Sequence, residues 1–273
     1  MCAAQRKRGA KVDLGIRGRT AIVNGGSAGM GRGTALALAN EGVTLYISAR
    51  TEERLENTCR ELADTSGSRV VPVVADHSTA EGREAILAAC PEPDILVTNC
   101  SPPPFTGDYR TVEREDWIAN MEVTLLSPVE LMKQVVPGMV ERGWGRVVNI
   151  GTGAAKFPAE VRILSGPPRA ALVNYSVAVA KAVARHNVMV NNVLPGMHHT
   201  ASIADRYHAA AEKNGTTYEE EVQKFVDAWR IPANRFGDAE HFGAFVAMFC
   251  SEQAAYVSGQ SLVIDGGIGN ATF

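Results

Sequence analysis

Short apolar runs alternate with amphipathic stretches along most of this chain. The runs are apolar nearly throughout, as strands buried on both faces of a sheet should be. Seven of them predict strands: Thr20–Asn24, Val43–Ser48, Arg69–Ala75, Ile95–Thr98, Arg146–Ile150, Val188–Leu194 and Ser261–Ile264. Between them lie segments of helical length: Gly29–Glu41, Glu52–Asp64, Ala80–Ala89, Arg114–Arg142 and Arg169–His186. The alternation predicts a single α/β domain of Rossmann type, a doubly wound parallel sheet of about seven strands with helices on both faces.

Two segments depart from this alternation of strands and helices. Met197–Trp229 is more polar and helix-prone, and we interpret it as a helical lid insertion that covers about residues 197–232. Residues 1–17 carry a basic cluster, Arg6, Lys7, Arg8 and Lys11, and we expect a flexible N-terminal tail before a domain that spans residues 18–273. A targeting or nucleic-acid role is the alternative for that cluster.

Composition narrows the class of protein. The 273 residues carry a formal net charge of −3, which gives no general attraction to nucleic acid or to an anionic membrane. No apolar run reaches the roughly 18 residues that a membrane span needs, and the N-terminus lacks the apolar segment of a signal peptide. The five cysteines are scattered without a CxxC pair, so we expect reduced thiols in the cytoplasm and no metal site. Cys59, Cys90 and Cys250 lie in helix-like stretches and are expected in the core.

A glycine-rich loop joins the first predicted strand to the first predicted helix. It reads Asn24-Gly25-Gly26-Ser27-Ala28-Gly29-Met30-Gly31. Gly25, Gly29 and Gly31 allow a tight turn and close approach of the backbone to a pyrophosphate, which the amides of the helix N-terminus would bind. Because the loop lies between a buried strand and a helix, it predicts a dinucleotide site rather than a plain turn.

The spacing GxxxGxG resembles the loop of the short-chain dehydrogenase/reductase family, with Asn24 in place of that family's Thr. The resemblance extends from about Gly18 to Gly267. It is supported by Asp76, by Asn99-Cys100, by Asn149-Ile150-Gly151-Thr152, by Asn191-Asn192-Val193-Leu194-Pro195-Gly196 and by the closing Asp265-Gly266-Gly267. We therefore identify the chain as a member of this family, whose enzymes are oxidoreductases that use nicotinamide cofactors.

The cofactor residues follow partly from chemistry and partly from the resemblance. Ala49 removes the acidic residue that would bind a ribose 2′-OH, and Arg50 offers a guanidinium to a 2′-phosphate, so NADP(H) is favoured over NAD(H). Arg50 as a solvated residue at a helix start is the alternative. The resemblance implies that Ser27 and Met30 belong to the phosphate loop, that Asp76 and His77 lie near the adenine, and that Asn99 and Cys100 lie near the adenosine ribose. It also implies that Pro195, Gly196 and Thr200 flank the nicotinamide and the diphosphate.

The family's catalytic YxxxK motif is not where it would be expected. Tyr175 is followed at the fourth residue by Val179 instead of Lys, and Lys181 would point to another side of the helix. Tyr175 also lies closer to Pro195-Gly196 than the family's Tyr does to its Pro-Gly motif. We therefore interpret Tyr175 as a packing residue of the core or of a subunit interface.

Alignment without gaps from Pro195-Gly196 puts Ser165 at the Tyr position and Arg169 at the Lys position. The family's catalytic Ser and its helix Asn then correspond to Thr152 and Thr124. This arrangement resembles a divergent subgroup of bacterial β-ketoacyl-reductase-like proteins that lacks the YxxxK pair. That subgroup has a Lys-x-Pro segment, here Lys156-Phe157-Pro158, and then a Leu-Ser with an Arg four residues later.

A Ser hydroxyl is a far weaker acid than a phenol, and Arg stays charged, so the proton donor is expected to be non-standard. Our hypothesis is that Arg169 holds the cofactor ribose and that Thr152 and Ser165 bind the substrate oxygen. Lys156 or an ordered water would pass the proton, with His198 or His199 as a second source. Lys156 as a surface residue is the competing interpretation.

The sequence thus favours an NADP(H)-dependent carbonyl reductase or alcohol dehydrogenase acting on a small or medium organic substrate. One alternative is a non-redox isomerase or dehydratase on the same fold, and another is a cofactor-binding protein without redox turnover. The resemblance implies a homo-oligomer, a tetramer or dimer, assembled through the segments Arg114–Arg142 and Arg169–His186. No nucleic-acid or membrane partner is expected.

Overall fold

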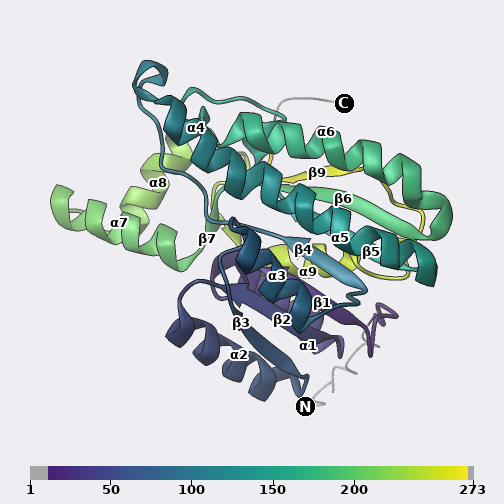
Figure 1. Ribbon diagram of the computed structural model, residues 1–273. Coiled ribbons are helices and arrows are strands. Elements are labelled where there is room, and N and C mark those ends of the chain that lie inside the picture. The colour runs from purple at the N-terminus through teal and green to yellow at the C-terminus, as the bar shows by residue number, and fades with distance from the viewer. Residues whose placement is uncertain (1–11, 270–273) are drawn as a thin grey trace, which may run out of the picture.

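The computed structural model describes residues 12–269, so the basic cluster at the N-terminus and Cys2 lie outside the described residues. One sheet contains all seven predicted strands, in the order β3-β2-β1-β4-β5-β6-β9, and every neighbouring pair is parallel. The strands are β1 (Thr20–Asn24), β2 (Thr44–Ala49), β3 (Val70–Val74), β4 (Ile95–Thr98), β5 (Gly145–Ile150), β6 (Val188–Pro195) and β9 (Ser261–Ile264). The predicted single-domain Rossmann-type fold is confirmed (Figure 1).

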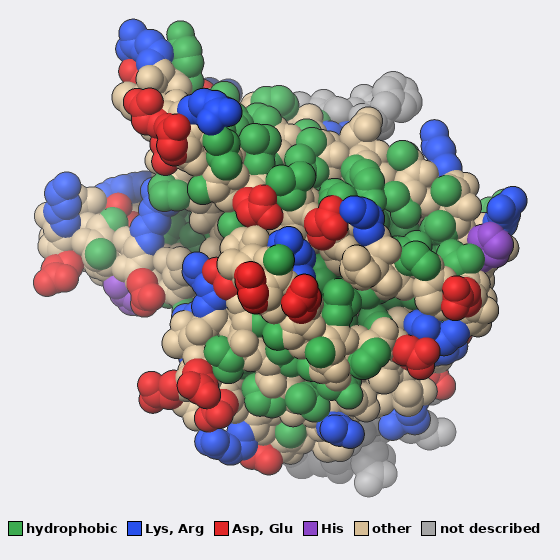
Figure 2. All heavy atoms as spheres, viewed as in Figure 1, with side chains coloured by type: hydrophobic (Ala, Val, Ile, Leu, Met, Phe, Trp, Pro, Cys, Tyr) green, Lys and Arg blue, Asp and Glu red, His purple; other side chains and the backbone are tan. Residues whose placement is uncertain are grey.

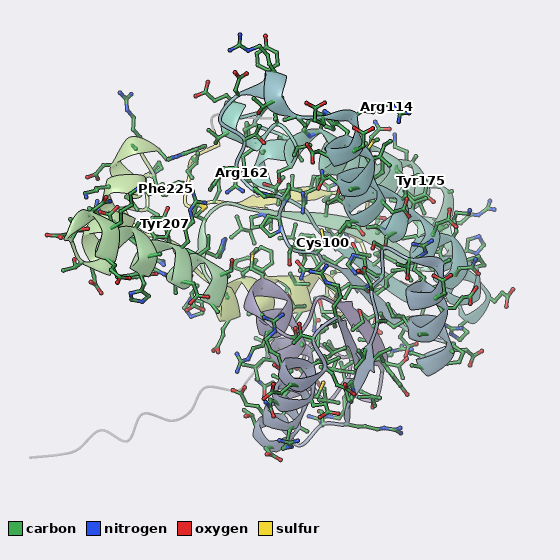
Figure 3. The ribbon with its side chains drawn as sticks, turned by 60° about the vertical axis from the view of Figure 1, so that its left-hand side comes forward. Cys100, Arg114, Arg162, Tyr175, Tyr207 and Phe225 are labelled. Carbon is green, nitrogen blue, oxygen red and sulfur yellow. The ribbon has the colours of Figure 1, made fainter. Side chains whose placement is uncertain are left out.

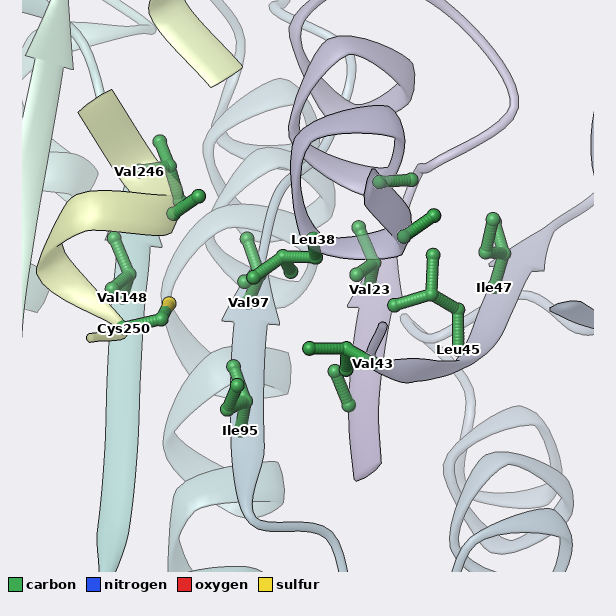
Figure 4. Close-up of a cluster of buried hydrophobic side chains, with 14 of the residues drawn as sticks. Val23, Leu38, Val43, Leu45, Ile47, Ile95, Val97, Val148, Val246 and Cys250 are labelled. Atoms are coloured by element: carbon green, nitrogen blue, oxygen red, sulfur yellow. The ribbon is translucent and has the colours of Figure 1, made fainter. Parts of the chain in front are cut away.

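Helices cover both faces of this sheet. On one face lie α1 (Gly29–Asn40), α2 (Glu52–Ser66) and α9 (Ala239–Phe249). On the other lie α3 (Ala80–Ala89), α5 (Ser127–Arg142) and α6 (Gly166–Val183). Successive strand residues alternate between two cores: Val23 and Val97 pack under α1 and α9 (Figure 4), whereas Ile22 and Leu96 pack under α5. This two-residue period explains why the strands are apolar throughout.

The predicted helix Arg114–Arg142 is interrupted. It consists of α4 (Arg114–Met121), a π-helical turn (Glu122–Leu126) and α5. Pro128 lies in the first turn of α5. Proline has no amide hydrogen and cannot donate a hydrogen bond to the preceding turn, so the π-helical turn ends where α5 begins. The other predicted long helix begins at Gly166 rather than at Arg169, because Pro167 and Pro168 fit the first helical turn, where amide donors have no intrahelical partner.

The helix α9 was not predicted. Asp238 caps it by accepting hydrogen bonds from the amides of Glu240 and His241, at 2.8 and 2.9 Å. It packs backbone to backbone on α1, since a Cβ on Gly243 would come within 2.2 Å of the Gly33 carbonyl. The contact between the two helices is therefore made by glycines, which give no apolar periodicity in the sequence.

The predicted lid insertion forms two helices, α7 (Ala201–Asn214) and α8 (Tyr218–Ala228), which project from one side of the molecule (Figure 1). A short parallel pair, β7 (His198–His199) with β8 (Gly237–Asp238), closes the base of this insertion. The lid has an apolar core of its own, which comprises Met197, Tyr207, Val226, Ile231 and Phe236 with Tyr218, Phe225 and Trp229 packed against it. The lid aromatics therefore serve first to hold α7 and α8 together.

The remaining short elements are 3-10 turns: Tyr109–Thr111, Gly153–Ala155, Glu160–Arg162 and Ala184–His186. Cys59, Cys90 and Cys250 are buried free thiols, as predicted, and burial raises the pKa of Cys250 to about 12. Among residues 12–269 there is no helix long and apolar enough to cross a lipid bilayer.

Candidate functional site

The candidate site lies at the carboxyl ends of β1 and β4, where the strand order reverses direction. Ligands of open α/β sheets bind at such a switch point, because the connections leave the sheet in opposite directions and open a crevice. β1 ends at Asn24, and β4 is followed by Asn99 and Cys100. A small cavity between these ends and α5 and α6 is lined by Asn24, His77, Thr98, Asn99, Cys100, Thr124, Ser127, Ile150, Arg169 and Leu172 among others.

The glycine loop is packed so tightly that no side chain would fit at Gly25 or Gly31. A Cβ on Gly31 would come within 2.3 Å of the Gly25 carbonyl oxygen, and one on Gly25 would lie 2.8 Å from the Asn99 Nδ2. Gly25 and Gly29 have φ values of +60° and +54°, which favour glycine. Helix α1 begins after Ala28 with no side-chain cap and no acidic residue in its first turn. Its free amides and positive dipole end fit a diphosphate.

Ser27 and Met30, the loop residues that the resemblance assigns to phosphate binding beside the glycines, contact the rest of the fold. The Ser27 carbonyl accepts a hydrogen bond from the Thr58 hydroxyl at 3.1 Å, and Ser27 itself is buried. Met30 packs against the core under α1, and its carbonyl accepts a bond from Thr34 at 2.8 Å. These contacts with α2 and with the core fix the conformation of the glycine loop.

Asn24 is buried, yet neither polar atom of its side chain has a hydrogen-bond partner within the described residues. An unsatisfied buried amide costs about 1–3 kcal/mol. Because Asn24 lines the cavity beside the glycine loop, its unsatisfied amide fits a cofactor bound in this crevice.

Arg50 and Asp76 lie together at the far side of the glycine loop. The Arg50 Nη1 is 3.9 Å from the Asp76 Oδ2, and the Arg50 side chain is 73% exposed, so its guanidinium is free to bind another anion. Burial opposes ionisation of Asp76, but hydrogen bonds from Ser78 and the charge of Arg50 lower its pKa. Next to it, His77 lines the cavity, and burial lowers the pKa of its imidazole.

Arg169 is the charged group at the centre of the crevice. It is 4% exposed, and its Nη1 donates to the Ser165 hydroxyl and carbonyl, at 3.2 and 3.3 Å. Its Nη2 donates to the Cys100 Sγ at 3.2 Å. The structure thus brings Ser165 and Arg169 next to Asn99 and Cys100, a pair about 70 residues earlier in the sequence.

A buried polar network sets the rotation of α6. The Asn149 amide on β5 donates to the Ser176 hydroxyl at 2.9 Å, and the Thr98 hydroxyl on β4 donates to the Asn149 Oδ1 at 2.6 Å. Arg169 precedes Ser176 by two helical turns and lies on the same face. The network therefore directs Arg169 toward the ends of β4 and β5.

Tyr175 lies on a different face of α6. With Val179 and Val183 it packs against the core between α5 and the sheet. In Figure 3, Tyr175 is on the side of the molecule opposite the lid, whereas Cys100 and Arg162 are nearer the lid.

Thr124 is buried in the π-helical turn and lines the cavity. Its hydroxyl donates to the Asn120 carbonyl at 2.7 Å, and the Asn120 amide donates to the Leu164 carbonyl. This chain of bonds connects the π turn to the residue before Ser165.

Thr152 and Lys156 are not bonded to Ser165 or Arg169 in the part of the chain that the structure describes. Thr152 follows β5, and its hydroxyl accepts from the Ala154 amide at 3.4 Å. Lys156 is exposed on the loop between β5 and α6, with its Nζ 5.8 Å from the centre of the Phe157 ring. The geometry thus places Lys156 on the surface of that loop.

The segment after β6 meets the glycine loop. A Cβ on Gly29 would lie 3.1 Å from the Thr200 Cγ2, so the base of the lid faces the phosphate loop across the crevice. The Thr200 hydroxyl also caps α7 by accepting from the Ile203 amide at 3.3 Å. Pro195, the last residue of β6, pairs with Ile264 of β9, and Gly196 after it packs against Asp265 after that strand.

The two histidines after Gly196 have packing partners. His198 is 5% exposed, with its ring edge-on to Phe242 at 5.1 Å, and burial lowers the pKa of its imidazole. The His199 Nδ1 lies 2.8 Å from the Tyr218 hydroxyl. Both therefore stabilise the base of the lid.

One cluster near the crevice was not predicted from the sequence. Arg162 and Arg206 both stack on Phe105, with their guanidinium carbons 3.9 and 4.2 Å from the ring centre. The three residues come from three separate segments, so no spacing rule could bring them together. No group of three or more His, Cys, Asp or Glu side chains suited to a metal ion occurs within residues 12–269.

Known proteins with the same architecture identify the family. A family model described as Enoyl-(Acyl carrier protein) reductase matches residues 25–269. The chain is 29% identical to an uncharacterized oxidoreductase, YvaG, of Bacillus subtilis, over 95% of this chain and 99% of that one. It is 30% identical to the NADPH-dependent reductase BacG of the same organism, over 91% and 97% of the two chains.

Among solved structures, L-sorbose reductase from Gluconobacter frateurii, complexed with NADPH and L-sorbose, superimposes with a TM-score of 0.89. It is 30% identical to this chain, and the match covers 94% of this chain and 98% of that one. The glycine loop, the seven-stranded parallel sheet and these matches together show that the chain belongs to the short-chain dehydrogenase/reductase family of oxidoreductases.

Proposed function

We propose that this protein is an NADP(H)-dependent oxidoreductase that transfers a hydride between the nicotinamide and a carbonyl or secondary alcohol of a small or medium organic substrate. One observation carries the proposal: Asn24, which leads into the glycine loop, lines the same cavity as the buried Arg169, whose guanidinium is hydrogen-bonded to Ser165. The names of BacG and L-sorbose reductase, one NADPH-dependent and one complexed with NADPH, support the choice of cofactor.

The chain offers a partner for each part of the dinucleotide. Amides of α1 and of the glycine loop would bind the diphosphate. The Arg50 guanidinium would bind the 2′-phosphate, with Asp76 and His77 beside the adenine. Asn99 and Cys100 would contact the adenosine ribose, and Pro195, Gly196 and Thr200 would flank the nicotinamide. When bound, the nicotinamide supplies or accepts the hydride.

The proposed proton chemistry differs from that of the YxxxK enzymes. Arg169 would hold the cofactor ribose, and Thr152 and Ser165 would donate hydrogen bonds to the substrate oxygen. A Ser hydroxyl is a poor proton donor, so Lys156 or an ordered water would deliver the proton. Lys156 is exposed, and it would have to turn inward from its place beside Phe157.

The test is nicotinamide absorbance with a panel of ketones and secondary alcohols. Arg169→Met should lower kcat about 100-fold or more, because the ribose and Ser165 lose the group that orients them. Tyr175→Phe should change kcat less than about twofold, since that ring packs in the core. Lys156→Met should abolish turnover without changing cofactor affinity, and unchanged turnover would remove Lys156 from the mechanism.

The opposite pattern would overturn the register on which this proposal rests. If Tyr175→Phe abolished turnover and Arg169→Met did not, the phenol would be the proton donor. Cofactor binding without any absorbance change would favour a binding protein. Substrate conversion without net oxidation of the cofactor would favour an isomerase or dehydratase.

We also propose that the protein assembles as a tetramer or dimer in the cytoplasm. The free thiols Cys59, Cys90, Cys100 and Cys250 fit a reducing compartment. The segment α4–α5 and the helix α6 present the faces through which the copies would meet.

A further inference from the structure

The cluster of Phe105, Arg162 and Arg206 lies where the lid meets the body of the protein. Phe105 belongs to the loop after β4, Arg162 to the 3-10 turn before α6, and Arg206 to the lid helix α7. The two guanidinium groups stack on the same ring, at 3.9 and 4.2 Å. The Arg162 Nη2 also lies 3.6 Å from the Sδ of Met197, the residue that follows Gly196. Figure 3 shows Arg162 between the lid helices and the sheet.

These arginines have no acidic partner. Within residues 12–269, Arg162, Arg206 and Arg169 form no ion pair with any carboxylate, although many other arginines of the fold do. Arg162 is partly buried, and burial together with the charges of Arg206 and Arg169 lowers its pKa to about 10. Three neighbouring cations with no anion are unfavourable, and a bound anion would remove that cost.

The cluster is nevertheless built to hold its shape. Phe105 holds both guanidinium groups through cation–π contacts, and apart from the weak bond from Arg162 Nη2 to the Met197 sulfur, their N–H groups have no hydrogen-bond acceptor among residues 12–269. A guanidinium binds an oxyanion through two parallel hydrogen bonds, a geometry that Lys cannot reproduce. Arg162 contacts Met197, the residue after Gly196, and lies close enough to Arg169 for their charges to interact. An anion held here would therefore lie beside the Arg169–Ser165 pair, where the proposed function places the substrate.

We infer that Arg162 and Arg206 bind an oxyanion, a carboxylate or a phosphate, carried by the substrate itself. This inference rests on the proposed reductase function, and it assigns the substrate class: an oxo compound with a negatively charged group. Arg206 comes from the lid and Arg162 from the body, so the anion would also draw the lid onto the substrate.

Matched pairs of substrates test this directly. 3-Oxobutanoate is compared with its methyl ester, and dihydroxyacetone phosphate with dihydroxyacetone, so each pair differs in one anionic group. The wild-type protein should have a kcat/KM at least about tenfold higher for the charged member of one pair, and that pair shows whether the anion is a carboxylate or a phosphate. Arg162→Gln and Arg206→Gln should each reduce this ratio, Arg162→Gln by about tenfold.

Lys213→Gln is the control, because it removes one positive charge from the exposed far end of the same helix, and it should leave the ratio unchanged. Arg162→Lys should restore only part of the preference. If Arg162→Gln failed to fold, the exposed Arg206→Gln would still give the answer.

Reduction of the neutral compounds with no preference for the charged ones would overturn the anion site and leave the proposed function standing. If no compound were reduced, the rise in melting temperature on addition of 3-oxobutanoate or dihydroxyacetone phosphate would decide. A rise in the wild type that is lost in Arg206→Gln would support the site. An equal rise in both, or none in either, would overturn it.

Discussion

Two arginines at the crevice, Arg169 and Arg50, differ in how firmly their surroundings hold them. Arg169 is buried and has three hydrogen-bond contacts, with the Ser165 hydroxyl, the Ser165 carbonyl and the Cys100 sulfur, so its position is fixed. Arg50 is mostly exposed and has one distant carboxylate, Asp76, so it is available to a ligand. A fixed guanidinium suits orientation of a reacting group, and an available one suits recognition.

Arg50→Ser should raise the KM for NADPH about tenfold and leave the KM for NADH nearly unchanged, because only NADPH carries the 2′-phosphate. Steady-state kinetics with both cofactors check this. Arg54→Ser on the exposed surface of α2 is the control and should alter neither value. Equal changes for the two cofactors would show that Arg50 does not recognise the phosphate.

The lid helices form a unit with polar bonds of its own. Glu221, 8% exposed, accepts hydrogen bonds from Lys224 at 2.5 Å and from Thr216 at 2.6 Å. The bond from Thr216 joins α8 to the connection after α7, and the bond from Lys224 lies within α8. Bonds from Lys224, Thr216 and Asn214, in that order, lower the pKa of Glu221 from its ordinary value of 4.5 to about 2.

A lowered carboxyl pKa stabilises the folded state above the unfolded value and ceases to do so as the pH falls through the folded value. Glu221→Gln should therefore lower the melting temperature at pH 7, and the gap to the wild type should shrink between about pH 4.5 and 2. Thermal unfolding followed by circular dichroism measures the gap. Glu219→Gln, on the exposed side of the same turn, should show no such pH dependence.

The molecule as a whole leaves several large apolar side chains exposed. Ile118 and Leu126, on α4 and the π turn, are 45% and 44% exposed. Figure 2 shows further hydrophobic side chains among charged ones over the face that α5 and α6 form. Exposed apolar side chains on neighbouring helices are typical of a surface that a second copy covers.

Light scattering after size exclusion should therefore report a tetramer or dimer at micromolar concentration. Leu126→Glu should shift the protein toward smaller species, because burial of the new carboxylate at the interface is costly. Tyr109→Glu changes a side chain that is 72% exposed on a separate turn, and it should not alter the assembly. A monomeric wild type would contradict the proposed assembly.

Much of the fold could be predicted from particular residues. All seven strands of the sheet were found, since runs such as Ile95–Thr98 are buried on both faces and must be apolar throughout. The helix α9 was missed because its contact with α1 depends on Gly33 and Gly243. The π turn was missed because it follows from the place of Pro128 within a longer helical pattern.

Some residues of the candidate site could likewise be predicted from the sequence, and others could not. The glycine loop and Arg50 could be found in the sequence, because their chemistry depends on neighbours along the chain. The bonds between Arg169 and Cys100, the orphaned amide of Asn24 and the stacking of Arg162 and Arg206 on Phe105 could not be found there.

The sequence by itself determined the architecture and the candidate cofactor loop, because periodicity and a local motif encode them. Only the tertiary structure decided which distant side chains meet at the crevice. The loops after β4 and β5 and the lid come together only when the strands assemble into the sheet, and the rotation of α6 depends on the buried bond between Asn149 and Ser176. Long-range packing, which no window of sequence contains, therefore determines which side chains lie beside the glycine loop.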